Sequence, residues 1–295
     1  GAVSYGSESI INFVESSSNI SNMQGGGDDF GVPLGATRYP SGGSTLFSSA
    51  AYLNYFKRWS EKIHTEIGVR TTFSYLEASF ADTISRDPLN ISGTTIKSSN
   101  NIFSGNIKLT YYPNQSWKIS AVTAKGFHSP NIDDMGKLFV KGGNLTIPNP
   151  DLKPEYSYSQ ELSISKQINN KLLVYGNGFY TIIQDAIIKD TMFVNLNSSN
   201  PNVDPFWVNQ VIYDNEPKYT FSNQNIGSAS IYGFNFGFEG VFLNNFSFSG
   251  DINFTYGQKS DGFGPLAHIP PAFGKFLVEK KIGGLEVAID LSYAL

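Results

Sequence analysis

The chain of 295 residues contains no cysteine and three histidines, His64, His128 and His268. The lack of cysteine excludes a disulfide framework, a thiolate metal site and a cysteine nucleophile. Three histidines so far apart in the sequence argue against a multi-histidine metal centre. The sequence therefore predicts neither a resident metal nor another cofactor.

Charge is also scarce. Asp, Glu, Lys and Arg make up 16% of the residues, and the formal net charge is −4; soluble domains usually have about 25% charged residues. The sequence contains no run of Lys and Arg, so a nucleic-acid partner has no electrostatic footprint and none is expected. No apolar run approaches the roughly 18 residues that a membrane helix needs.

Long stretches in which apolar and polar residues alternate are the strongest positive feature. From Phe246 to Tyr256 one face is apolar and the other is polar. The stretches 63–75, 232–242 and 285–295 show the same pattern. A period of two predicts β-strands. Strands in soluble proteins have about 5–6 residues, whereas about 9–11 residues of tilted strand cross a bilayer. The lengths therefore favour membrane-spanning strands.

Short and long connections alternate along the chain. Tight connections are expected at 57–62, 112–116, 169–170, 244–245 and 283–284, and long polar ones at 16–44, 76–100, 128–154, 189–217 and 259–270. A meander with all its short turns at one end is typical of outer-membrane barrels. The predicted fold is all-β, an antiparallel transmembrane β-barrel meander with about 11 strands.

Aromatic residues cluster beside the expected short turns. Rings at one level around a barrel would form a girdle at the membrane interface. The residues in question are Tyr55, Phe56, Trp59, Tyr111, Tyr112, Trp117, Phe242 and Phe246.

Two phrases in the middle of the chain resemble a known family. Box 1 lies in Gly126–Lys137 and contains Phe127, His128, Ser129 and Pro130; box 2 contains Asn149, Pro150, Asp151, Leu152, Lys153, Pro154 and Glu155. Together they resemble the Phe-Arg-Ala-Pro and Asn-Pro-Asn-Leu boxes of TonB-dependent outer-membrane receptors, in a Bacteroidetes-type form.

This resemblance implies a barrel of about 22 strands in the bacterial outer membrane, plugged by an N-terminal domain. Residues 1–295 are then expected to be a partial barrel domain, without the plug, the TonB box or the last strands. The implied partners are outer-membrane lipid, the TonB complex acting through the missing plug and TonB box, a small nutrient complex, and a surface lipoprotein.

The resemblance implies uptake of a scarce nutrient complex, with an iron–siderophore complex as the commonest cargo of the family. Haem, cobalamin, a peptide and a glycan stay open as cargoes. The family box usually carries Arg where this chain has His128. No histidine occurs from Asn131 to Pro148, where haem-binding members are expected to carry an axial ligand, and this disfavours haem.

Five residues are candidates for ligand contact. Arg38, Tyr39 and Arg70 would suit an anionic ligand, because guanidinium groups bind carboxylate and catecholate oxygens. His128 stands where a strand meets a long loop, and Trp207 lies in another long loop. Each of these residues is also compatible with a purely structural role. Asp133 and Asp134 lack the spaced acidic pattern of a calcium site and are expected to be solvated loop acids.

Other functional classes have weaker support. The sequence shows no Gly-x-Ser-x-Gly elbow and no local pairing of a nucleophile with a base, so an enzyme is not expected. A passive porin-like barrel and a soluble β-sandwich or β-solenoid are the alternatives. The paired boxes disfavour the porin, and the strand lengths disfavour the soluble folds.

Overall fold

One antiparallel sheet dominates the computed structural model of the protein. The structure describes residues 1–17, 37–81, 89, 91–169, 171–195, 206–213, 216–242, 246–260, 264–266 and 269–295. Its eleven long strands are β1 (Ala2–Val14), β2 (Ser44–Arg58), β3 (Ile63–Ser79), β4 (Thr95–Tyr111), β5 (Trp117–His128), β8 (Glu155–Ile168), β9 (Leu172–Thr191), β13 (Glu216–Phe242), β14 (Phe246–Lys259), β15 (Phe273–Ile282) and β16 (Leu285–Ala294).

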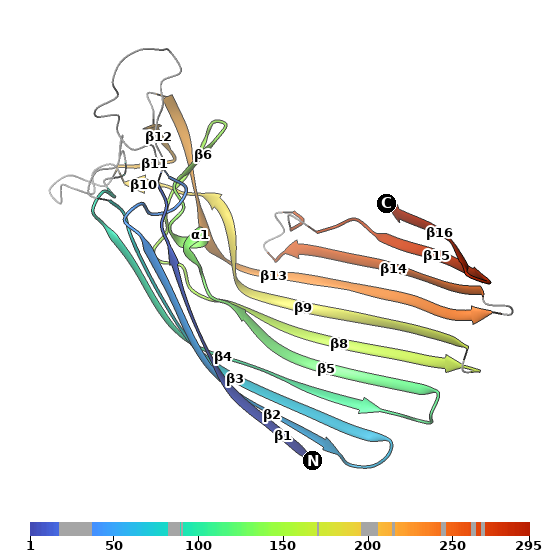
Figure 1. Ribbon diagram of the computed structural model, residues 1–295. Helices are drawn as coiled ribbons and strands as arrows, with labels where there is room; N and C mark the ends of the chain where they lie inside the picture. Colours follow the sequence, from blue (N-terminus) through green and yellow to red (C-terminus); the bar gives the residue numbers. More distant parts are fainter. Residues whose placement is uncertain are drawn as a thin grey trace.

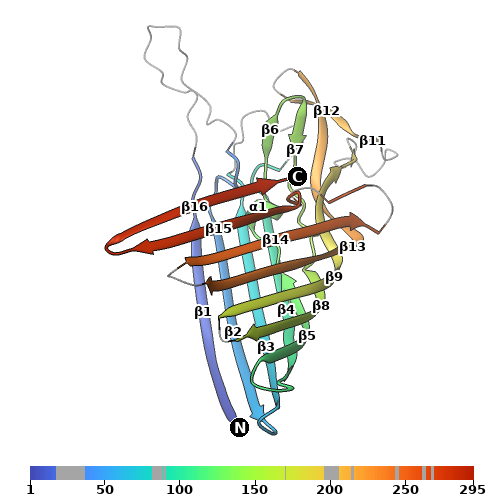
Figure 2. The ribbon, with the colours of Figure 1, turned by 90° about the vertical axis from the view of Figure 1, so that its right-hand side faces the viewer.

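These strands follow one another across the sheet in chain order, from β1 to β16. Each pairs antiparallel with its neighbour. The sheet is strongly curved, with the short turns gathered at one end and the long connections at the other (Figure 1). A view from the side shows the twist that carries β16 across the direction of β1 (Figure 2). The predicted all-β meander is confirmed.

Smaller elements occupy the long connections. They are α1 (Ile132–Met135), β6 (Phe139–Lys141), β7 (Asn144–Thr146), β10 (Val194–Asn195), β11 (Trp207–Val208) and β12 (Gln210–Tyr213). The sequence analysis had treated these stretches as irregular. Within the described residues, no helix is long and apolar enough to cross a membrane.

Two of the predicted long connections are too long. The connection predicted at 76–100 is shorter because β3 continues to Ser79 and β4 begins at Thr95. The connection predicted at 189–217 contains three short strands and the first residues of β13. Here the paired strands continue with polar residues on their exposed side, so the alternation that marked them in the sequence is weaker.

The sheet has two chemically different faces. The outer face carries exposed apolar side chains, including Ile107, Leu162 and Phe234. Further along this face, towards the long connections, it becomes polar, and Lys97 pairs with Glu77 there at 3.1 Å. An apolar band bounded by polar side chains is the pattern expected of a lipid-facing wall.

The predicted aromatic girdle is only partly correct. Near the short turns, Trp117 and Phe246 lie opposite lysines on the outer face, with ring-to-ammonium distances of 4.7 and 4.4 Å. Phe56 and Tyr112 instead contact His64, at ring distances of 5.8 and 5.2 Å. His64 lies on the inner face, because it alternates with outward-facing Ile63 and Thr65.

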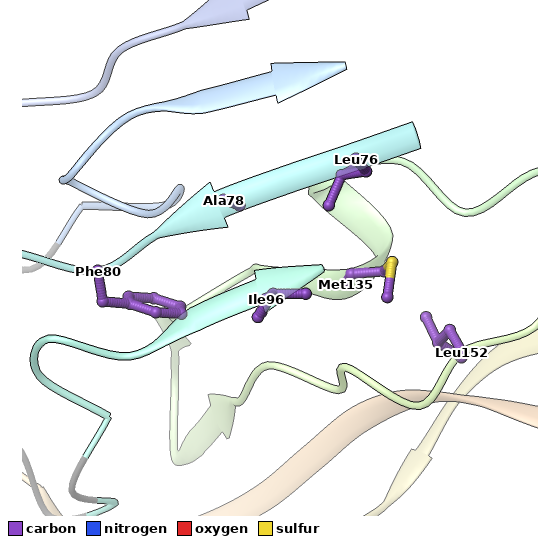
Figure 3. Close-up of a cluster of buried hydrophobic side chains, with 6 residues drawn as sticks. All are labelled: Leu76, Ala78, Phe80, Ile96, Met135 and Leu152. Carbon is purple, nitrogen blue, oxygen red and sulfur yellow. The ribbon is translucent and has the colours of Figure 1, made fainter. Parts of the chain in front are cut away.

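A compact core lies on the inner face at the long-connection end. Leu76 and Ala78 of β3, with Ile96 of β4, are buried there beneath Met135 of α1 and Leu152 (Figure 3). A second cluster joins the β6–β7 hairpin to β12 and consists of Leu138, Leu145, Ile147, Val211 and Tyr213. These two cores fix the segment 128–154 against the wall.

Candidate functional site

Box 1 passes from the end of β5 directly into a capped helical turn. The side-chain oxygen of Asn131 accepts hydrogen bonds from the backbone N–H groups of Asp133 and Asp134, at 2.7 and 3.1 Å. The carboxylate of Asp134 in turn accepts the N–H of Asn131 at 3.0 Å. This reciprocal capping box satisfies N–H groups that a helix start leaves without partners. It turns the chain sharply inward after β5.

His128 is held by the same carboxylate. Its Nε2 lies 2.9 Å from Oδ2 of Asp134. His128 is the last residue of β5, outside the apolar band. The hydrogen bond to Asp134 raises the pKa of His128 above its usual value, although partial burial opposes this. The imidazole is thereby tied to α1.

Asp133 joins two cations at the same place. Arg38 approaches Oδ1 of Asp133 through Nε at 2.9 Å and through Nη2 at 2.8 Å, and Lys137 reaches Oδ2 at 2.9 Å. Partial burial acts to raise the pKa of Asp133, but Lys137 and Arg38 outweigh it and hold this pKa below its usual value. The expectation that Asp133 and Asp134 are solvated loop acids is wrong, because both carboxylates have defined partners.

Box 2 is locked by strand β13. The side chain of Asn149 donates to the carbonyl oxygen of Asn223 at 2.8 Å, and its backbone N–H donates to the carbonyl oxygen of Met135 at 2.9 Å. Asn225 accepts the backbone N–H of Lys153 at 2.8 Å and donates to the carbonyl oxygen of Lys153 at 3.0 Å. Asn225 thus pairs with this backbone much as a strand would.

The rest of box 2 closes the arrangement. Leu152 is buried against Met135 of α1. Glu155 accepts the backbone N–H of Ile187 on β9 at 2.8 Å. The two boxes therefore position the loop, and their asparagine, proline and leucine residues serve mainly structural roles.

The structure brings together some of the predicted ligand contacts. Arg38 and His128 bind the adjacent carboxylates of Asp133 and Asp134. The guanidinium of Arg38 lies 5.6 Å from the ring of Tyr39. These three residues surround α1 at the long-connection end of the sheet.

Arg70 and Trp207 lie apart from that cluster. Arg70 is on the inner face of β3, where it pairs with Glu8 of β1 at 2.8 Å and lies beside a hollow of about 620 Å³ lined by Asn54, Asn106 and Ser157. Trp207 belongs to the small sheet of β10 and β11, and 60% of its surface is exposed.

Sequence reasoning missed several residues that shape this region. Asn223 and Asn225 lie far from the boxes in sequence, so nothing local linked them to box 2. Lys189 of β9 reaches the hydroxyl of Thr146 on β7 at 2.7 Å. The spacing from Asn131 to Asp134 is a recognisable capping signal and would have located α1.

No metal centre emerges from the side chains described in the structure. Among them, no group of three or more His, Cys, Asp and Glu residues could hold a metal ion. The chemistry available at this end of the sheet is instead that of fixed cations beside aromatic rings.

Comparison with known proteins gives a consistent result. Residues 4–285 match the model of the family described as TonB dependent receptor-like, beta-barrel. The iron-regulated outer membrane virulence protein of Vibrio cholerae serotype O1 is 30% identical over 90 residues, which are 29% of this chain and 14% of that protein.

Solved structures resemble the whole sheet. The copper transporter OprC has a TM-score of 0.68 at 15% identity, with 97% of this chain and 39% of that chain covered. The siderophore receptor PiuA from Acinetobacter baumannii has a TM-score of 0.61 at 14% identity, with 99% and 42% covered. This chain thus spans less than half the length of each of these relatives, and the structural likeness concerns the fold.

Proposed function

The chain belongs to the TonB-dependent receptor family, and from this we propose that it contributes eleven barrel strands to a receptor that takes up a scarce nutrient complex. Receptors of this family lie in the outer membrane and are not enzymes. The apolar outer face described above is the surface that contacts lipid. The TonB complex, acting through a plug and TonB box, and a surface lipoprotein are the proposed protein partners.

We assign an iron–siderophore complex as the cargo. The observation that carries this assignment is the group of fixed cations around α1, where Arg38 and Lys137 are held by Asp133 beside the ring of Tyr39. Cations of this kind suit the oxygen-rich, anionic chelates that carry ferric iron. The names of the Vibrio cholerae relative and of PiuA support the same cargo.

The residues proposed to contact the ligand fall into two levels. Arg38, Tyr39, His128 and Trp207 lie at the extracellular end, where the ligand would first bind. Arg70 lies on the inner face, along the path that a captured ligand would follow. Haem is a poorer candidate, since Nε2 of His128 is occupied by Asp134.

A passive pore is also disfavoured by the structure. The segment 128–154 folds over the inner face with α1 and the β6–β7 hairpin, where an open pore would need free space. Energised uptake and diffusion make opposite predictions for cells that lack TonB.

Uptake of radioactive iron tests the proposal. Cells carrying the gene for this chain, and cells deleted for it, are grown under iron limitation and offered a panel of ferric siderophores. We expect one siderophore class to be taken up only by cells that have both the gene and TonB. Uptake that persists without TonB would support a passive pore, and identical uptake of the whole panel with and without the gene would refute an iron cargo.

A further inference from the structure

The β6–β7 hairpin has two unlike faces. Leu138 and Leu145 point into the core that the hairpin shares with β12. Phe139 and Lys141 lie on the opposite face, since residues alternate along a strand. Thr146 is directly opposite Phe139 in the pairing register and therefore shares this second face.

Four cations converge on that second face. The guanidinium of Arg38 lies 5.9 Å from the centre of the Phe139 ring. Lys137 precedes the strand by two positions, and Lys141 ends it. Lys189 reaches across from β9 to donate to the hydroxyl of Thr146 at 2.7 Å. We call Arg38, Lys137, Phe139, Lys141 and Lys189 the basic face.

The positive charge of the basic face is largely uncompensated. Asp133 pairs with both Arg38 and Lys137. Within the part of the chain that the structure describes, no carboxylate forms a salt bridge with Lys141 or Lys189. Partial burial, and then the charges of Lys137 and Lys141, lower the pKa of Lys189. The lysines are thus close enough to repel one another, and an anion placed among them would relieve this repulsion.

The basic face also offers an exposed aromatic ring. Phe139 is 39% exposed, although its neighbours Leu138 and Leu145 are buried. An exposed ring flanked by cations can stack on a flat aromatic group while ammonium and guanidinium groups bind that group's oxygens. Ring and charges lie within a few residues of each other, which suits a small ligand.

We propose that the basic face binds a multiply charged anion with flat aromatic rings, of the kind represented by a ferric triscatecholate. This assignment rests on the receptor function proposed above and adds the chemical class of the ligand. It distinguishes such a chelate from a ferric trihydroxamate, which has no net charge and no aromatic ring.

The test compares both chelates on outer-membrane vesicles from cells that produce the receptor. Variants Lys141→Gln and Lys189→Gln, singly and together, are compared with Lys259→Gln. Lys259 ends β14, away from the hairpin, and its substitution removes the same charge. We expect each hairpin variant to weaken triscatecholate binding about tenfold, as for the loss of one charge-assisted contact, the double variant to weaken it further, and Lys259→Gln to leave it unchanged. Heat-modifiable mobility on gels checks that every variant forms the barrel.

The outcomes separate the two proposals. If vesicles with the unaltered receptor bind neither chelate, and cells take up no ferric siderophore through it, the proposed function fails. If the unaltered receptor binds triscatecholate and the folded double variant binds it equally well, the basic face is not the site. Binding of the trihydroxamate alone would likewise overturn the assignment while leaving an iron receptor in place.

Discussion

Replacing Met135 by alanine should detach α1 and box 2 from the barrel wall while leaving the wall intact. The Met135 side chain is completely buried between β3, β4 and Leu152. Truncating a buried methionine to alanine usually costs about 2–5 kcal/mol. Because α1 has four residues and depends on this packing, the cost should appear as local opening of the segment 131–153.

Hydrogen exchange can measure that opening. The backbone N–H of Asn149 donates to the carbonyl oxygen of Met135, so its protection reports the docked state. A loss of 2–5 kcal/mol corresponds to a decrease in protection of about thirtyfold to several thousandfold. The amide of Leu162, in the middle of β8, should keep its protection.

The matched control is Phe193→Ala. Phe193 follows β9, and 53% of its surface is exposed, so its truncation should change protection by no more than about twofold. If Met135→Ala changed the protection of Asn149 as little as this control does, the packing of α1 would not hold box 2 in place. If Leu162 lost protection equally, the cluster would stabilise the entire sheet instead.

Three further predictions concern the same loop. Asn131→Ala removes both capping bonds from α1 and should destabilise the docked loop by about 1 kcal/mol, seen as faster exchange at Asp133; normal exchange there would show that the cap is dispensable. The raised pKa of His128 means that its pairing with Asp134 stabilises the loop fully below the ordinary histidine pKa of about 6.5 and loses that effect as the pH rises through the raised value. Proteolysis of the loop should therefore speed up with pH in the unaltered protein more than in His128→Gln, and parallel pH profiles would contradict this. Asn225→Ala should leave the backbone of Lys153 without its partners and free box 2, at a cost of about 1–3 kcal/mol; Asn225→Asp, which keeps the acceptor, should retain the bond from the N–H of Lys153 and cost less by the same exchange assay.

The pH argument depends on what surrounds His128. Its Nε2 is held by Asp134, and the charge of Glu155, its partner across the β5–β8 register, also raises its pKa. Both groups favour the protonated form, so the direction of the effect does not depend on which of them dominates.

The strands could be predicted because a lipid-facing wall writes itself into the sequence locally. Each strand must present apolar side chains to one face and polar ones to the other, as in Phe246–Tyr256, and residues two apart are sufficient to show it. The same reasoning failed where β3 and β4 extend past the apolar band, since there water bathes the outer face and the alternation fades.

The site was only partly predictable. The two boxes were visible as strings, and Arg38 and His128 were correctly expected at the ends of loops. The sequence did not show that adjacent carboxylates, Asp133 and Asp134, would join them. Nor did it indicate that Asn149 would bond to Asn223, 74 positions away.

The sequence by itself thus determined the strand-forming segments, their order and the family boxes, because periodicity, turn residues and short motifs are properties of neighbouring residues. Only the tertiary structure decided which side chains meet at the mouth of the barrel. Lys189 meets Thr146, and Arg38 meets Phe139, because the sheet curves and the β6–β7 hairpin packs on β12. The meeting of cations around one exposed ring is set by packing between distant segments, and no local pattern encodes it.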